Sequence, residues 1–373
     1  MKEKQIIESL LKGTDITING SNPWDPQIHN DNFYSRVLKD GSLGLGESYV
    51  DGWWNCEKLD EFFDKVLNAH LDKKIKYNWK VISRFIWSRI LNVGRKSKAF
   101  EVGQKHYDIG NDLYRTMLDK RLTYTCGYWS GNLPVNGLDA AQEAKLDLVC
   151  KKIGLKHGQK ILDIGSGWGS FIGYAAEKYG VHAVGVTVSK EQKGLADKLY
   201  EKLPVETKLQ DYRDINEKFD HVVSLGMFEH VGHKNYRTFM KVVHRTLKDD
   251  GLFLLHTIGC NQSMKGIDPW IYRYIFPNGM LPSTAQIGKS IEGLFVMEDW
   301  HSLGADYDKT LMAWYNNFEN NWNSIKSSYD KRFYRMWKYY LLSCAGSFRS
   351  RNIQLWQIVL SKNGVRGGYK SIR

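Results

Sequence analysis

The stretch that decides the fold is Lys160-Ile161-Leu162-Asp163-Ile164-Gly165-Ser166-Gly167-Trp168-Gly169. Its first half is a short apolar run, which predicts a buried strand over residues 160–164. The glycines that follow let the backbone turn sharply and approach a ligand closely, and a helical pattern over residues 170–179 comes next. A strand, a glycine-rich turn and a helix in this order predict the start of a Rossmann-like fold with a nucleoside cofactor at the turn.

Three details narrow the kind of cofactor, because the glycines alone would fit many Rossmann proteins. The spacing GxGxG is tighter than the usual dinucleotide fingerprint. No lysine follows the turn, which argues against a phosphate-cradling P-loop. Asp163 precedes the turn, where its carboxylate would repel a pyrophosphate but attract a ligand that carries an ammonium and a sulfonium group. We therefore expect S-adenosylmethionine here.

Strand and helix patterns alternate through the rest of the chain, which predicts an α/β fold with a mainly parallel sheet covered on both faces. The predicted strands are 160–164, 182–188, 205–210, 219–225, 252–258, 295–300 and 356–361. The predicted helices of this part are 139–153, 170–179, 190–202, 234–247, 283–292, 307–323 and 329–348.

The ends of the first predicted strands should line one crevice at the carboxyl edge of the sheet. Thr187 or Gln192 can reach a ribose there, and Asp211 can accept a hydrogen bond from an adenine amino group. Methyltransferases often carry an acidic residue at the end of the second strand, and this chain does not. The predicted cofactor residues are Tyr124, Thr125, Asp163, Gly165, Ser166, Gly167, Trp168, Gly169, Thr187, Val188, Gln192, Gln210, Asp211 and Tyr212.

Four further side chains fall in loops that can converge above the sheet, namely Cys126, Glu229, His256 and Tyr307. A single histidine or cysteine is more often a satisfied core residue than a functional one. Four groups of this kind that can face one crevice favour a reactive site.

The bulk composition limits the class of protein. A chain of 373 residues suggests two domains, or one domain with large additions. Its 53 basic and 41 acidic residues give a net charge of +12, which favours an anionic partner such as nucleic acid or an acidic membrane surface. The five cysteines are scattered without a CxxC pair, so we expect no disulfide framework and no metal site. The scattered cysteines also fit a reducing cytosol. The N-terminus does not read as a signal peptide and no apolar run approaches membrane-spanning length, so we expect that if the protein meets a membrane, it does so at the surface.

The N-terminal part has a different character. Helices are predicted over 3–12, 32–39 and 58–71, with a flexible connection over 41–46. Residues 73–98 hold nine Lys or Arg residues and no Asp or Glu, interleaved with aromatic and aliphatic side chains. This segment is typical of a helix that lies on a membrane surface, or of a helix that packs its apolar face on its own domain. We expect a helical lipid- or membrane-binding domain over 1–92, a linker over 93–105 and a catalytic domain over 106–373.

Long motifs in both parts resemble the cyclopropane-fatty-acyl-phospholipid synthase family. The most specific are QKHYDIGNDLY (104–114), TYTCGYW (123–129), ILDIGSGWGSF (161–171), GMFEHVGHKNY (226–236), DPWIYRYIFPNGMLPS (268–283) and LLSCAGSFRSRNIQLWQIV (341–359). GSLGLGESYVDGWW (41–54) extends the resemblance into the N-terminal part, which the related mycolic acid cyclopropane synthases lack. The resemblance implies a class I methyltransferase fold.

The resemblance also implies a reaction, in which the methyl group of S-adenosylmethionine is added to a cis double bond of a phospholipid acyl chain. Removal of a proton then closes a cyclopropane ring and S-adenosylhomocysteine (SAH) leaves. The implied base is a bound bicarbonate, held by Cys126, Glu229, His256, Tyr307 and the backbone of Ile258. Aromatic side chains would stabilise the developing cation. The candidates are Tyr124, Trp129, Phe228, Trp270, Tyr274 and Tyr307.

The family further implies a homodimer and contact with the inner face of a membrane, for which Trp53 and Trp54 are candidate contacts. Cys344 matches a cysteine of the family that has been considered catalytic, although the chemistry has no thiol step and a packing role is expected. Three alternatives stay open: a methyl transfer that yields a branched or hydroxylated lipid, a lipid-binding protein without turnover, and a methyltransferase of small molecules or nucleic acid. The sequence has no NPPY-like motif for a flipped base, which argues against a nucleic-acid methyltransferase.

Overall fold

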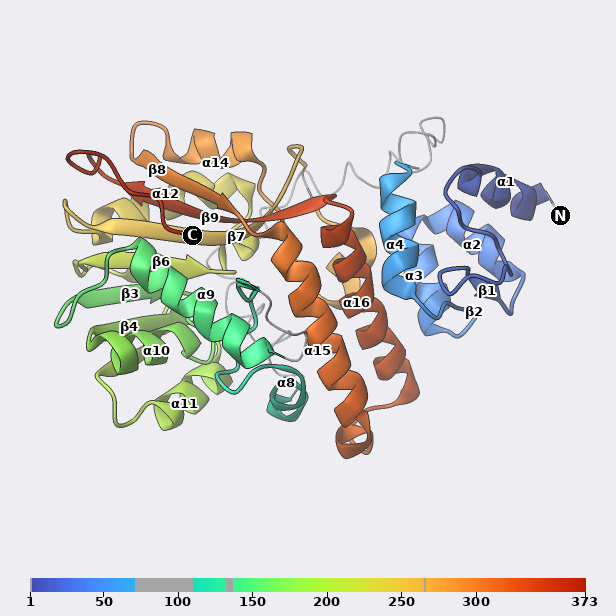
Figure 1. Cartoon of the computed structure of the whole chain (residues 1–373), viewed down its shortest axis with the longest axis horizontal. Coiled ribbons are helices and arrows are strands. Elements are labelled where there is room, and N and C mark those ends of the chain that lie inside the picture. The colour runs from blue at the N-terminus through green and yellow to red at the C-terminus, as the bar shows by residue number, and fades with distance from the viewer. Residues whose placement is uncertain (1, 71–109, 132–136, 265) are drawn as a thin grey trace. The chain divides into compact units, whose positions relative to one another are not determined.

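The computed structural model describes residues 2–70, 110–131, 137–264 and 266–373. Contacts divide the chain into two compact units (Figure 1). Unit 1 comprises Met1–Leu91, Lys265–Pro277 and Tyr307–Ile353, and unit 2 comprises Asn92–Met264, Asn278–Asp306 and Gln354–Arg373. The predicted linker over 93–105 and the basic segment 73–98 lie outside the described residues. The contacts differ from the predicted boundaries because they group residues 307–353 with the N-terminal helices, so the division into a lipid-binding and a catalytic domain stays a prediction.

Unit 2 is built on a seven-stranded sheet with the order β5-β4-β3-β6-β7-β9-β8. The strands are β3 (Lys160–Ile164), β4 (His182–Thr187), β5 (Val205–Leu209), β6 (His221–Leu225), β7 (Leu252–Cys260), β8 (Val296–Ser302) and β9 (Ile353–Ser361). Neighbours from β5 to β7 pair in parallel, and β8 pairs antiparallel with β9. The predicted Rossmann-like α/β fold is confirmed, and its strands fall close to their predicted bounds.

Alternate residues of the central strands face opposite layers of helices, as side chains of a strand must. Leu162 faces one core with α12 and α14, whereas Ile161 faces the other with α9 and α10. Both faces are therefore covered, and Figure 1 shows these two helical layers on either side of the sheet. The helices of unit 2 are α8 (Asn111–Met117), α9 (Leu138–Lys152), α10 (Ser170–Tyr179), α11 (Lys190–Leu199), α12 (Tyr236–Thr246) and α14 (Thr284–Ile291).

Unit 1 is mainly helical, as expected for the N-terminal part. Its elements are α1 (Lys2–Leu11), β1 (Gln27–Ile28), α2 (Asn32–Asp40), α3 (Ser42–Val50), β2 (Trp54–Asn55), α4 (Leu59–Asn68), α13 (Pro269–Tyr274), most of α15 (Gly304–Ile325), and α16 (Lys331–Arg349). Helix α16 packs against α3 and α4. Arg349 at its end joins these segments, because it donates to Asp60 at 2.7 Å and to both oxygens of Asp308 at 3.0 Å.

Two N-terminal predictions were wrong. The predicted flexible connection over 41–46 is the first half of α3, because its glycines serve close packing rather than flexibility. A Cβ on Gly46 would lie 2.3 Å from the Trp270 ring, and one on Gly44 would lie 2.4 Å from the Arg36 carbonyl oxygen. Trp54, a predicted membrane contact, is completely buried and donates to the Leu45 carbonyl at 3.1 Å.

The ring of Tyr200 lies close to helix α10, which follows the glycine turn. A Cβ on Gly173 would lie 2.1 Å from this ring, so Gly173→Ala should lower the free energy of unfolding by about 2 kcal/mol through overpacking. Gly194 is the matched control, since a Cβ there meets no atom within 4 Å and Gly194→Ala should raise stability by about 0.5–1 kcal/mol. Urea unfolding followed by circular dichroism measures both. Equal effects of the two variants would contradict the packing argument.

Candidate active site

The turn after β3 is fixed to the neighbouring strand. The amides of Gly165 and Ser166 both donate to the Val186 carbonyl oxygen at 3.0 Å. Gly165 has a φ of +88°, a left-handed conformation that a side chain rarely adopts, and a Cβ there would lie 2.6 Å from the Met227 side chain. The turn therefore brings bare backbone close to the residues that follow β6.

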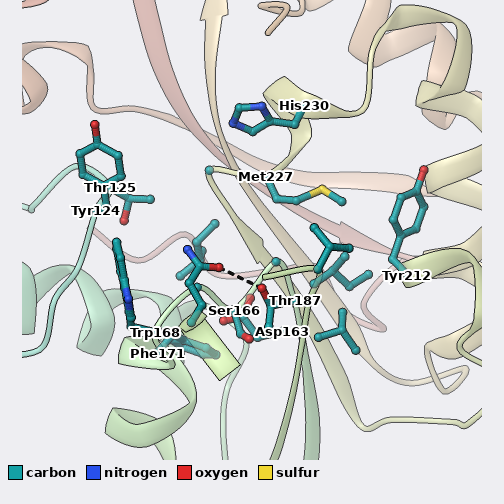
Figure 2. A pocket seen from close by; sticks show the side chains of 18 of the residues that line it. Tyr124, Thr125, Asp163, Ser166, Trp168, Phe171, Thr187, Tyr212, Met227 and His230 are labelled. Atoms are coloured by element: carbon teal, nitrogen blue, oxygen red, sulfur yellow. Dashed lines mark hydrogen bonds between the residues drawn. The ribbon is translucent and has the colours of Figure 1, made fainter. Parts of the chain in front are cut away.

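This turn forms one edge of a cavity at the carboxyl ends of the strands. Thirteen of the fourteen predicted cofactor residues line it, and the exception is Gly169, which caps the N-terminus of α10. Figure 2 shows Trp168 on one side of the cavity and Tyr212 opposite, with Asp163 below and His230 above. The sequence thus located the cavity correctly, and the role of these residues in binding a cofactor stays a prediction.

The polar side chains expected to hold a nucleoside already contact one another or a neighbour. Thr187 Oγ1 donates to the side-chain Oε1 of Gln192 at 2.9 Å. The backbone amide of Gln192 donates to Ser189 Oγ at 3.3 Å, so Ser189 caps α11 as expected. The Asp211 carboxylate receives Nε and Nη2 of Arg213, both at 2.8 Å. Arg213 was not predicted here, and it leaves Asp211 oriented and charge-compensated.

The floor of the cavity carries unused polar atoms. Asp163 Oδ1 and Ser166 Oγ are buried, and neither has a hydrogen-bond partner within residues 2–70, 110–131, 137–264 and 266–373. Burial raises the pKa of Asp163 to about 7, and the charge of Lys145 partly opposes this shift. A buried carboxyl and hydroxyl in an aromatic-walled cavity fit a ligand with an adenosine body and an amino-acid tail, as S-adenosylmethionine has.

Glu229 lies in a short 3-10 turn after β6 and reaches the neighbouring strand. Its Oε1 accepts a hydrogen bond from the Ile258 amide at 2.6 Å, whereas its Oε2 is buried with no partner among the described residues. Burial raises the pKa of Glu229 to about 7. The Ile258 amide, expected to contact a bound anion directly, is occupied by Glu229 and so acts to orient this carboxyl group.

His256 lies within β7 rather than in a loop after it, because β7 continues to Cys260. Its Nδ1 is 3.3 Å from Nε2 of Gln357 on β9, and its Nε2 is buried without a partner in the part of the chain that the structure describes. Burial, with the nearby charges of Lys145 and Lys152, holds the pKa of His256 well below its usual value. The ring is therefore neutral at neutral pH and presents one unused nitrogen.

The loop that carries Cys126 meets the end of β6. A Cβ on Gly226 would lie 2.7 Å from the Thr125 methyl carbon, and the Gly226 amide donates to the His256 carbonyl at 2.9 Å. Cys126 is completely buried, and its thiol donates to the Gly127 carbonyl at 3.0 Å. Unit 2 thus brings the segments of Cys126, Glu229 and His256 close to one another, and the convergence of their side chains on one ligand stays a prediction.

The remaining candidates belong to unit 1. Tyr307 lies within α15 rather than in a loop, and its ring packs on Phe348 at a centroid distance of 4.5 Å. Its place beside Glu229 stays a prediction. Cys344 lies within α16, where burial raises its pKa to about 12. The thiol is therefore neutral, which agrees with a packing role.

Among the aromatic candidates, two serve as core rather than as a wall of the site. Phe228 is completely buried and stacks on Tyr236 at 4.3 Å between ring centroids. Trp270 is completely buried in unit 1 and lies 4.5 Å from the Tyr339 ring. Tyr124, by contrast, lines the cavity of unit 2.

Four residues near these groups were not predicted from the sequence, namely Lys145, Met227, His230 and Gln357. Lys145 is completely buried on α9 and donates to Thr125 Oγ1 at 2.8 Å. The sequence held a signal for two of them. Lys145 falls among the apolar residues of the predicted helix 139–153, and Gln357 falls within the apolar run of the last predicted strand. A polar side chain at a core position usually has a specific partner.

Comparisons with known proteins agree with this geometry. The family model of mycolic acid cyclopropane synthetase matches residues 94–358. The cyclopropane-fatty-acyl-phospholipid synthase of Escherichia coli K12 is 52% identical over 369 residues, covering 99% of this chain and 96% of the relative. The structure of the cyclopropane synthase MmaA2 from Mycobacterium tuberculosis has a TM-score of 0.66 at 32% identity, covering 70% of this chain and 98% of that one.

A second solved structure, the mycolic acid cyclopropane synthase CmaA1 complexed with SAH and CTAB, has a TM-score of 0.66 at 33% identity. The match covers 70% of this chain and 98% of the chain in that structure. The family match spans well over half of the chain and includes the glycine turn, Glu229 and His256. The chain therefore belongs to the mycolic acid cyclopropane synthetase family.

Proposed function

We propose that this protein is a cyclopropane-fatty-acyl-phospholipid synthase, which adds a methylene group across a cis double bond of a phospholipid acyl chain. The observation that carries this proposal is the 52% identity to the Escherichia coli enzyme over nearly the full length of both chains. The solved mycolic acid enzymes match only 70% of this chain. Family membership makes a non-catalytic lipid-binding protein and a nucleic-acid methyltransferase the less favoured functions.

The methyl donor is S-adenosylmethionine, bound in the cavity of unit 2. When bound, its sulfonium supplies an electrophilic methyl group. The chain's own part is to orient the donor and exclude water, since an alkene is a weak nucleophile that reacts only at close approach. Asp163 and Ser166 at the floor supply the unused polar atoms, and Trp168 and Tyr212 supply the apolar walls.

We further propose that Glu229 and His256, with Cys126 and Tyr307, hold a bicarbonate ion that would supply the base. The unused atoms Glu229 Oε2 and His256 Nε2 fit such an ion, because both are buried and polar. A neutral His256 can donate from Nε2 without charge. Glu229, with a pKa of about 7, can exist as the neutral acid beside an anion and so avoid like-charge repulsion.

The substrate's location implies contact with a bilayer. We propose that the protein is cytoplasmic and binds the anionic inner face of the membrane peripherally. The net charge of +12 supports contact with an anionic surface. From the family resemblance we also propose a homodimer. Among the described residues, no helix is both long and apolar enough to cross a bilayer. Trp53 remains a candidate contact, although its ring lies 4.7 Å from the Arg36 guanidinium.

The reaction is tested by the product. Phospholipid vesicles with cis-unsaturated chains, incubated with the protein and methyl-labelled S-adenosylmethionine, should gain one CH₂ per modified chain and lose the double bond. Mass spectrometry with and without catalytic hydrogenation measures both changes. A mass gain of CH₂ with the double bond retained would instead indicate a methylated alkene. A gain of CH₄ would indicate a methyl-branched chain, and a gain of CH₄O would indicate a methylated, hydroxylated chain.

The two buried groups should act in the chemistry and not in donor binding. Glu229→Gln and His256→Ala should each lower kcat by at least about 100-fold, in the range expected for loss of acid–base function. The dissociation constant for SAH, measured by calorimetry, should stay within about twofold, because neither residue lines the donor cavity. Glu206→Gln is the control, since this carboxyl group is exposed on β5. A parallel loss of SAH binding would refute the assigned roles.

The anion is tested separately from the side chains. In buffer freed of carbon dioxide, turnover of the wild-type protein should slow and recover as bicarbonate is added, along a saturable curve. Glu229→Gln should show little response to the same titration, because the site that holds the ion is impaired. Chloride at equal ionic strength controls for salt effects. A wild-type rate that ignores bicarbonate would remove the ion from the mechanism.

A further inference from the structure

A lysine without an assigned role contacts a residue that lines the cofactor cavity. Lys145 is completely buried on α9, and its ammonium donates to Thr125 Oγ1 at 2.8 Å. One turn earlier on the same helix, Gln142 Nε2 donates to the Thr125 carbonyl at 2.7 Å. Helix α9 therefore holds Thr125, which lines the cavity, by both its side chain and its backbone.

Burying an ammonium group is costly, so its surroundings should reveal what offsets the cost. The groups whose charges act on Lys145 are Asp119, Cys126 and Asp163. Asp119 is already committed, because it accepts from the amides of Arg121 and Thr123 at 3.0 and 2.7 Å. Cys126 donates from its thiol to the Gly127 carbonyl oxygen at 3.0 Å.

Asp163 differs from these neighbours. It lines the cavity, and its Oδ1 has no partner in the described ranges. Burial opposes its ionisation, and among the described residues Lys145 is the charged group that favours it. Of the groups around Lys145, Asp163 is therefore the one whose ionisation both depends on the lysine and affects a ligand in the cavity.

We propose that Lys145 is a positioning residue of the cofactor site, which holds Thr125 in place and keeps Asp163 ionised to receive the α-ammonium group of S-adenosylmethionine. This inference rests on the proposed cofactor. The carboxylate then interacts with two positive charges, one supplied by the fold and one by the ligand. Lys145 acts through Asp163, so its effect should depend on whether a ligand carries an ammonium group.

The pH dependence follows from the groups named. Burial raises the pKa of Asp163 to about 7 and lowers the pKa of Lys145 to about 8. Removing the lysine charge raises the pKa of Asp163 further, so the carboxyl group becomes neutral at neutral pH. Affinity for an ammonium-bearing ligand should then fall at neutral pH and recover only at higher pH.

The test compares two ligands with the same adenosine body. SAH carries the amino-acid tail and 5′-methylthioadenosine lacks it. In Lys145→Met, SAH should bind about tenfold more weakly at neutral pH, which corresponds to about one unit of pKa, and the acid limb of its binding should move to higher pH. Binding of 5′-methylthioadenosine should change by less than about twofold. Calorimetry between about pH 6 and 9 gives both profiles.

Two further variants complete the design. Lys151→Met is the matched control, because Lys151 lies on the same helix, is largely exposed and pairs with Asp147 at 2.6 Å, so it should leave both profiles unchanged. In the Asp163→Asn background, Lys145→Met should weaken SAH binding by less than about twofold, as for 5′-methylthioadenosine, which a double-mutant cycle detects.

Each other outcome would overturn the inference. An equal loss for both ligands would give Lys145 a structural role only, and an unchanged SAH profile would remove its influence on Asp163. Additive losses in the cycle would show that it acts by another route. If the wild-type protein bound neither ligand, the proposed cofactor itself would fail, and this result is distinct from the other three.

Discussion

The Val186 carbonyl oxygen accepts hydrogen bonds from both Gly165 and Ser166, and the cavity of unit 2 depends on this arrangement. The two amides leave the end of β3 and fold back on β4, so the chain must turn sharply before α10 begins. The turn is possible because Gly165 adopts a left-handed conformation. With no side chain at this position, Met227 can lie against the backbone, and the turn and the segment after β6 enclose one cavity.

Burying two carboxyl groups within unit 2 has an energetic consequence. Asp163 and Glu229 are both buried, and both have a pKa raised to about 7. Each carboxyl group therefore titrates near neutral pH, and the charge of a nearby ligand can determine whether it is protonated. A cationic donor beside Asp163 favours the carboxylate, whereas an anion beside Glu229 favours the neutral acid. Under the proposed function, the same kind of side chain would therefore meet a cation at Asp163 and an anion at Glu229.

Much of this organisation could be predicted from sequence, because it rests on local patterns. The strand 160–164 and its glycine turn are read directly from the apolar run and the glycine spacing, and the cavity residues follow from strand ends. Prediction failed where a residue's role is set by a distant partner. Gly46 looked flexible because Trp270, which it packs against, is far away in the sequence. Trp54 looked like a surface contact because nothing local shows that it is completely buried.

The pairing of His256 with Gln357 depends on topology in the same way. The chain leaves the sheet after β8, forms α15 and α16, and returns as β9 between β7 and β8. Had the chain added its last strand at the edge, no β9 side chain would be adjacent to β7. The inserted position puts Gln357 3.3 Å from His256 Nδ1 and leaves Nε2 as the nitrogen available to a ligand. Strand β9 therefore determines which nitrogen of the imidazole is left without a hydrogen-bond partner among the described residues.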